Sequence, residues 1–160
     1  QNLAVSARTI RFYESQLKDY DKAIADLVST LPGNPLATVS GIGPVYSAGI
    51  LAEIGEISRF RDQAALAKYA GLTWSRHQSG DFDADHTHMI QSGNRYLRYY
   101  LIEAANMVRL HDPDYAAFYQ KKLSETNVTP RKRALVLTAR KLVRLVFALL
   151  RDNKFYTPSV

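Results

Sequence analysis

The sequence contains no cysteine, which excludes disulfide bonds and thiolate metal sites. No apolar run approaches the roughly 20 residues of a membrane-spanning helix, and the N-terminal residues lack the apolar segment of a secretion signal. No stretch has the period of a convincing strand, and no internal repeat or low-complexity tract is visible. We predict an all-α fold, and 160 residues suffice for one sizeable core or two small ones.

Acidic residues are scarce in the second half of the chain. Residues 1–90 hold 8 Lys/Arg and 10 Asp/Glu, whereas residues 91–160 hold 13 Lys/Arg and 5 Asp/Glu. This asymmetry favours a polyanionic partner for the C-terminal half, although a merely basic, solvated surface would have the same composition. The chain begins with Gln1 rather than methionine, and we expect it to be a piece of a longer protein.

The first 31 residues repeat apolar side chains with the spacing of a coiled coil. One heptad position holds Leu3, Ile10, Leu17, Ile24 and Leu31, and the alternate position holds Ser6, Tyr13, Tyr20 and Leu27. This 3–4 spacing over four heptads predicts a helix that self-associates as a dimer. The alternative is an amphipathic helix that folds back on its own domain. We prefer association, because such a long helix has little obvious partner within the chain.

Residues 36–55 predict a helix, a tight hairpin and a second helix. Gly41 and Gly43 flank the hairpin, and glycine takes positive φ without steric cost. Pro44 suits the first position of the second helix. Free backbone N–H groups at that helix N-terminus suit a phosphate, as in helix-hairpin-helix modules that grip nucleic-acid backbones. The alternative is a turn whose glycines only allow close packing.

Four further helices are predicted around one long polar loop. They cover residues 62–70, Arg95 to His111, a segment opened by Asp112 and Pro113, and Pro130 to about Arg151. We expect the second of these helices to bury Leu97, Leu101, Ala104, Ala105 and Val108, and the last to bury Leu135, Ala139, Leu142, Val146, Leu149 and Leu150. The chain divides into an association helix (1–31), a helical domain (36–151) and a C-terminal tail (152–160).

The last predicted helix carries a line of arginines. Arg133, Arg140, Arg144 and Arg151 are spaced 7, 4 and 7 residues apart, which places them on one helical face, flanked by Lys132 and Lys141. Four aligned cations favour a surface that faces phosphates.

Residues 71–94 form a polar loop with room for a short hairpin. A loop of this length in a compact domain is usually functional. Ser79 lies within it, and Arg76, Arg95 and Arg98 are the nearest arginines. A serine that attacks a phosphodiester needs cations more than a histidine, because negative charge develops on the phosphate. The alternative is an ordinary turn serine.

Two other chemistries fit this loop poorly. Its alternating aspartates at 81, 83 and 85 lack the glutamate and central glycine of a calcium loop. His86 and His88 have no further zinc ligand at a recognisable spacing. A Ser–His–Asp hydrolase needs a strand-to-helix elbow, and no sheet is predicted. We therefore expect no metal site and no hydrolase triad.

Four motifs follow one another between residues 36 and 151. They are VSGIGPVYSAGILAEIGEISRFRDQAALAKYAGL, QSG, SGNRYLRYYLIEAA and KRALVLTARKLVRLVFALL. In this order they resemble the C-terminal transposase domain of the insertion-sequence one-ten family, also called bridge recombinases. The resemblance implies an N-terminal RuvC-like domain with a DEDD acidic set that binds Mg²⁺, joined by a coiled coil that supports dimers. It also implies a structured bridge RNA that selects donor and target DNA.

The resemblance further implies that Ser79, in the QSG motif, attacks DNA and forms a covalent 5′-phosphoserine link, with Ser75 as the runner-up. We expect contacts to DNA or RNA from Gly41, Gly43, Arg76, Arg95, Arg98, Arg133, Arg140, Lys141 and Arg144. The dimer could assemble into a tetramer on DNA. A prokaryotic cytoplasmic location is implied, at the nucleoid when active, with no membrane partner.

The chain departs from the family pattern in two ways. The DEDD domain is absent, so we expect this piece to be inactive alone. The segment after Ser79, DFDADHTH, is acidic where relatives are often basic, which puts contacts between this segment and nucleic acid in doubt. Two other functions compete with a transposase: a non-catalytic helix-hairpin-helix module from a repair or replication protein, and a structural dimer whose basic helices only pack.

Overall fold

The computed structural model describes residues 2–31, 33–74, 78–79, 82–83, 89–90, 92–125 and 129–158. Its elements are α1 (Asn2–Thr30), η1 (Pro35–Thr38), α2 (Pro44–Ile54), η2 (Ile57–Arg59), α3 (Gln63–Tyr69), β1 (Thr73–Trp74), β2 (Gln78–Ser79), β3 (Phe82–Asp83), β4 (Met89–Ile90), α4 (Arg95–His111), α5 (Pro113–Ser124) and α6 (Pro130–Asp152). The predicted all-α fold is confirmed. Among the described residues, no helix is both long and apolar enough to cross a membrane.

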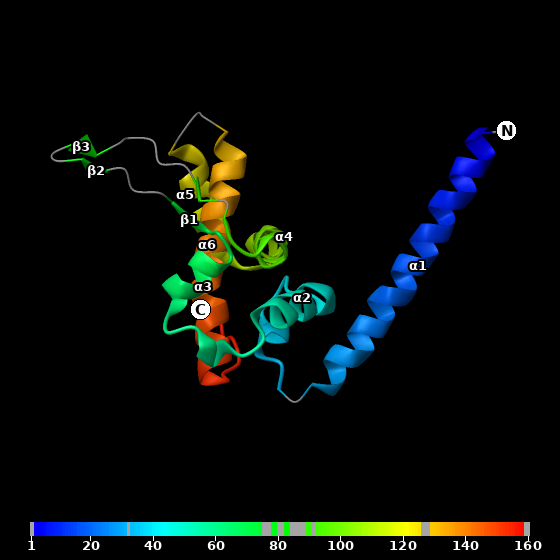
Figure 1. The fold of residues 1–160 in the computed structure, drawn as a ribbon, viewed down its shortest axis with the longest axis horizontal. Coiled ribbons are helices and arrows are strands. Elements are labelled where there is room, and N and C mark those ends of the chain that lie inside the picture. Colours follow the sequence, from blue (N-terminus) through cyan, green and yellow to red (C-terminus); the bar gives the residue numbers. More distant parts are fainter. Residues whose placement is uncertain are drawn as a thin grey trace.

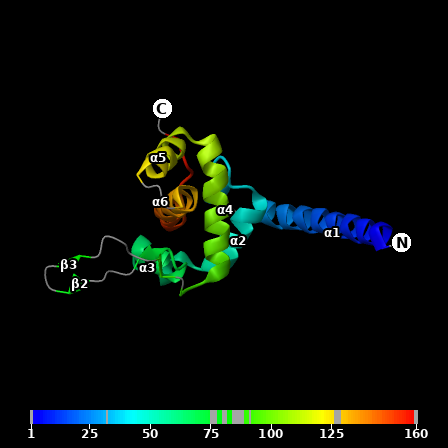
Figure 2. The ribbon, with the colours of Figure 1, turned by 90° about the horizontal axis from the view of Figure 1, so that it is seen from above.

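Helix α4 lies at the centre of the helical body, with α2 on one side and α5 and α6 on the other (Figure 2). The five apolar residues predicted for its inner face are all buried. Its first turn is capped by Asn94, whose Oδ1 accepts hydrogen bonds from the backbone N–H groups of Tyr96 and Leu97. Capping and one clear apolar stripe therefore explain where α4 begins and how it packs.

Helix α6 buries a broader face than its predicted stripe. Leu135 and Leu150 are only half-buried, whereas four residues outside the prediction are buried: Ala134, Thr138, Val143 and Phe147. The physical reason is that α6 packs against α3, α4 and α5 together. Thr138 tolerates burial because its hydroxyl donates to the backbone oxygen of Ala134 at 2.8 Å.

The segment after α6 returns to the body. The backbone N–H of Tyr156 donates to Thr38 Oγ1 at 2.8 Å, and its hydroxyl donates to Asp112 Oδ2 at 2.5 Å. Asp112 is buried and caps α5 through its other oxygen, Oδ1. Burial, and then the hydrogen bond to Asp112, raise the pKa of Tyr156 to about 12. This tail therefore joins η1 to the start of α5.

Helix α1 projects from the body, on the side opposite to β2 and β3 (Figures 1 and 2). Near its C-terminal end, Ile24, Ala25 and Val28 are half-buried where α1 meets α2. Earlier seam residues stay exposed, with Leu3 at 85% and Leu17 at 61%. The helix does not fold back on its domain, and its seam residue Ile24 is half-buried near α2.

The turn before α2 differs in part from its prediction. It is preceded by the four-residue 3-10 helix η1, so the predicted helix-hairpin-helix motif is not confirmed. Gly41 has the expected positive φ of 99°, and Pro44 does open α2. Gly43, however, has φ of −73° and is the extended residue that precedes the helix. The two glycines therefore have different roles.

The polar loop contains two short antiparallel pairs. β1 pairs with β4, with Thr73 opposite Ile90, and β2 pairs with β3, with Ser79 opposite Phe82. The short hairpin that the sequence allows within this loop is confirmed and consists of β2 and β3. The β1–β4 pair at the base of the loop was not predicted. Strands of two residues carry too little periodicity to be recognised in a sequence.

Candidate nucleic-acid interface

The two ends of the polar loop meet at a tightly built base. Gly71 and Gly93 both have positive φ, of 69° and 138°. A Cβ atom on Gly93 would lie 2.6 Å from the backbone oxygen of Tyr69, and one on Gly71 would lie 2.9 Å from that of Ser92. Only glycine fits at either position, so the start and end of the loop are held side by side. We call the segment between Gly71 and Gly93 the arm, and we call β1, β4 and these two glycines the arm base.

Asn94 connects the arm base to α2. Its backbone N–H donates to the oxygen of Tyr69 at 2.7 Å, and its side-chain Nδ2 donates to Glu53 Oε2 at 2.6 Å. The same side chain caps α4 through Oδ1. One residue therefore joins α2, α3 and α4 where the arm leaves the body. Sequence reasoning missed this role of Asn94 and Glu53, although the SGN triplet before a helix was the available signal.

Ser79, the predicted nucleophile, lies on β2 in the outer pair of strands. Figures 1 and 2 show β2 and β3 away from the helices, so this arrangement does not bring the Ser79 backbone next to α4. Ser75 and Arg76 lie outside the described residues. We call β2 and β3 the arm tip.

Arg95 and Arg98 have different surroundings on α4. Arg98 is half-buried at the arm base, where its Nη1 donates to the backbone oxygen of Ala70 at 3.4 Å and lies against Gly71. Arg95 is exposed and stacks on the neighbouring Tyr96 ring, with the guanidinium carbon 4.8 Å from the ring centroid. Arg98 therefore supports the arm base, whereas Arg95 remains at the surface.

The arginine line on α6 is only partly available for a ligand. Arg140 is half-buried and donates to Gln63 Oε1 at 2.7 Å, and burial, followed by the nearby charge of Arg144, lowers its pKa. Arg144 is exposed and forms no hydrogen bond or ion pair with the rest of the described chain. Two like charges one helical turn apart favour an anion that would relieve their repulsion.

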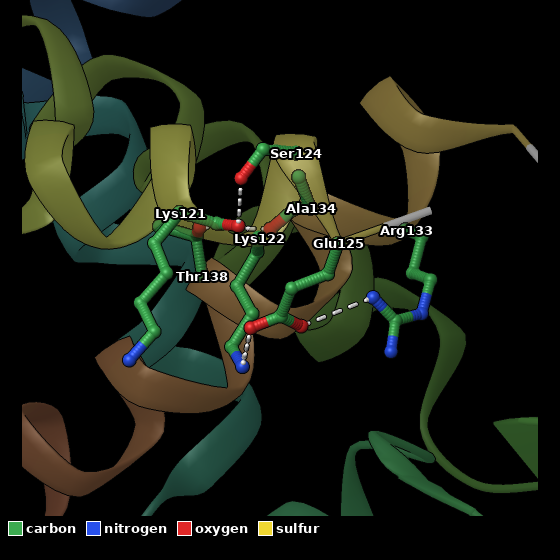
Figure 3. Close-up of polar contacts among 7 residues, drawn as sticks. All are labelled: Lys121, Lys122, Ser124, Glu125, Arg133, Ala134 and Thr138. Atoms are coloured by element: carbon green, nitrogen blue, oxygen red, sulfur yellow. Dashed lines mark hydrogen bonds and ion pairs between the residues drawn. The ribbon is translucent and has the colours of Figure 1, made fainter. Parts of the chain in front are cut away.

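Three other cations on or near α6 have local partners. Figure 3 shows the Glu125 carboxylate between Lys122, at 2.7 Å, and Arg133, at 3.5 Å. The hydrogen bond from Lys122 is the main cause of a lowered pKa for Glu125. Lys141 donates to the backbone oxygen of Asp114 at 3.1 Å and lies over the Tyr115 ring. Arg144 is therefore the least compensated of the α6 cations predicted to bind nucleic acid.

The N-terminus of α2 is a weaker place for a phosphate than its sequence indicates. A shallow hollow there is lined by residues 43–46 and by Asp21 of α1. The Asp21 carboxylate would repel a phosphate close to that helix end. Gly41, by contrast, packs closely against the backbone of α4.

The described residues contain no group of three His, Cys, Asp or Glu side chains that could hold a metal ion. The Mg²⁺ that the family resemblance implies therefore does not fit a site in this part of the chain. What the described geometry offers is a projecting arm with a rigid base, and separate basic surfaces on α4 and α6.

A family model and individual known proteins both match this chain over most of these elements. The family model described as Transposase IS116/IS110/IS902 family matches residues 33–120, from η1 to α5. The chain is 29% identical over 147 residues to the insertion element IS116 uncharacterized 44.8 kDa protein of Streptomyces clavuligerus, covering 91% of this chain and 36% of that protein. It is 30% identical over 152 residues to the pilin gene-inverting protein of Moraxella bovis, covering 91% and 46%.

A third relative, the transposase for insertion sequence element IS1111A of Coxiella burnetii, is 27% identical over 147 residues, covering 90% of this chain and 38% of that protein. The chain thus spans about a third to a half of the length of these relatives. Because the family model matches more than half of the chain, including the arm, the chain belongs to the IS116/IS110/IS902 family of transposases.

Proposed function

We propose that this chain is the C-terminal part of a DNA transposase, in which it binds DNA and supplies a nucleophilic serine. The observation that carries the proposal is the family match over residues 33–120, which contains the whole arm and its base. The held arm base supports it, because a projecting segment with a rigid attachment suits delivery of a side chain to a bound strand.

In the proposed reaction, Ser79 Oγ attacks a DNA phosphorus atom. An Oγ–P bond forms as the hydroxyl loses its proton, the bond between phosphorus and the 3′-oxygen breaks, and the leaving 3′-oxygen takes up a proton. The products are a free 3′-hydroxyl and a 5′-phosphoserine link. Arginine side chains would stabilise the charge that develops on the phosphate. Because β2 lies away from α4 and α6 in this structure, we propose that DNA binding brings the arm tip and the cations of these helices together.

Two finer proposals follow from the family resemblance. A structured guide RNA would select the DNA sites, and an N-terminal acidic domain outside this chain would hold Mg²⁺ and act with Ser79 in a composite site. The second proposal places the metal outside this chain, whose described residues hold no group of three His, Cys, Asp or Glu side chains that could bind one.

Duplex DNA binding through α6 is expected to depend steeply on salt. Each phosphate neutralised contributes a slope of about 0.9 in log affinity against log salt. Arg144→Ala should reduce that slope by about one unit and weaken binding at low salt. Fluorescence anisotropy with labelled duplex at several salt concentrations measures both quantities.

Arg11→Ala is the matched control, because Arg11 is an exposed arginine on α1, far along the chain from α6. Its slope should equal that of the wild type. If Arg144→Ala and Arg11→Ala give the same slope as the unchanged protein, α6 does not face the DNA backbone.

We also propose that α1 forms a dimer through its exposed seam. Leu17→Glu places a charge in that seam, so we expect it to convert the dimer to a monomer at roughly tens of micromolar. Ser15→Glu, on the outer side of the helix, should leave the dimer intact. Sedimentation velocity separates the species, and a monomeric wild type at this concentration would contradict the proposal.

A further inference from the structure

Two tyrosines on α4 are more than half exposed, although the opposite side of this helix is the centre of the core. Tyr96 is 54% exposed and Tyr99 is 56% exposed. We propose that these two rings, together with Arg95, form a stacking surface for the unpaired bases of a DNA strand. The inference rests on the proposed function, and it adds the form of DNA that this surface takes.

The rings are oriented before any ligand arrives. Arg95 lies over the Tyr96 ring at 4.8 Å, and its Nη2 donates to the Tyr96 hydroxyl at 2.7 Å. Tyr99 meets the edge of Tyr100, with centroids 5.4 Å apart and planes at 67°. Tyr100 is itself held against Gly49, where an added Cβ would lie 2.5 Å from the ring. Rings fixed in this way lose little freedom when a base stacks on them.

The chemistry around the rings suits a nucleotide. Exposed aromatic rings beside a cation are the combination that binds single strands, because every base has a π face and every link carries a phosphate. Beyond Tyr99 on the same helix, Glu103 and Asn106 are half-buried and polar, Ile102 and Met107 are half-buried and apolar, and Leu110 is 60% exposed. It is therefore the two rings and Arg95 that favour a nucleotide.

The position on the fold favours an unpaired strand rather than a duplex. Tyr96 and Tyr99 lie in the first two turns of α4, which begins two residues after Gly93 of the arm base. The base faces of a duplex are covered by their neighbours, so stacking on tyrosine requires bases that are unpaired. Strand cleavage and exchange by an arm attached here would present such bases near α4.

The experiment uses the full-length protein that carries this chain and a single-stranded DNA that contains 2-aminopurine, whose fluorescence falls when it stacks. We expect quenching with the wild type, and a loss of single-strand affinity of roughly 5- to 150-fold for Tyr96→Ala or Tyr99→Ala. Tyr96→Phe keeps the ring and should keep the quenching. Duplex affinity should be unchanged in all three variants, and Tyr20→Ala, which removes a ring that is 63% exposed on α1, should match the wild type.

Three results would overturn the inference. They are an unchanged single-strand affinity in both Tyr96→Ala and Tyr99→Ala, an equal loss of affinity for single-stranded and duplex DNA, and a loss of affinity for single-stranded RNA but not for single-stranded DNA. Because both tyrosines are exposed, thermal unfolding should not shift, and the phenylalanine variant separates loss of the ring from loss of structure. A wild type that binds neither single-stranded nor duplex DNA at low salt would refute the proposed function itself. A wild type that binds duplex with a steep salt slope but does not quench 2-aminopurine would refute only this inference.

Discussion

Gly41→Ala is expected to destabilise the chain by about 2–5 kcal/mol. Two costs add at this position. A residue other than glycine is strained at φ of 99°, and its Cβ would lie 2.7 Å from the backbone nitrogen of Val108 in α4. Backbone of a central helix cannot move aside as a flexible side chain can. The cost is a large share of the stability of a typical domain, about 5–15 kcal/mol.

Gly43→Ala is the matched control for this prediction. Gly43 lies two residues away, has φ of −73°, and would have no heavy atom within 4 Å of an added Cβ. Its replacement should cost less than about 1 kcal/mol. Urea unfolding of both variants gives the difference in free energy. Equal destabilisation by the two substitutions would show that the contact with α4 does not determine the role of the turn.

Ser79→Ala in the full-length protein, assayed with the guide RNA proposed above, is expected to reduce DNA strand cleavage by on the order of 10³-fold or more. The reason is that no other group can form the covalent bond if Ser79 is the nucleophile. DNA affinity should stay close to that of the wild type, because the substitution removes one hydroxyl and no charge. Cleavage of labelled DNA and anisotropy, measured on the same preparation, test the two halves of this expectation.

Ser75→Ala serves as the discriminating variant, since Ser75 is the second serine that the sequence offers. It should retain cleavage within a few-fold of the wild type. If Ser75→Ala abolishes cleavage and Ser79→Ala does not, the nucleophile moves to Ser75 while the family assignment stands.

The helices could be predicted where local signals agree. α4 begins after the Asn94 cap and ends before Asp112 and Pro113, and its apolar residues form one clean stripe. α6 shows the limit of the same reasoning. Its buried Thr138 and Phe147 follow from packing against three helices, which the period of one helix does not reveal.

The candidate site was less predictable, because contacts between distant residues determine it. Gly41 and Gly43 have similar sequence contexts, but Gly41 packs against Val108 whereas Gly43 precedes a helix as its cap. Only the contact with Val108 distinguishes the two roles. Arg140 donates a hydrogen bond to Gln63, which is distant in the sequence. The spacing of the arginines therefore predicts the helical face on which each one lies, but not the side chain that it contacts. The direction of the arm depends on β1 and β4, which are too short to leave a pattern.

The central claim is that this chain supplies the serine that becomes covalently linked to DNA. The most direct measurement traps the full-length protein, together with the proposed guide RNA, on labelled DNA and maps the adduct by mass spectrometry. We predict a 5′-phosphate on Ser79 that disappears in Ser79→Ala and persists in Ser75→Ala. DNA binding that stays intact with no adduct on any serine would contradict the claim and favour a non-catalytic nucleic-acid-binding module.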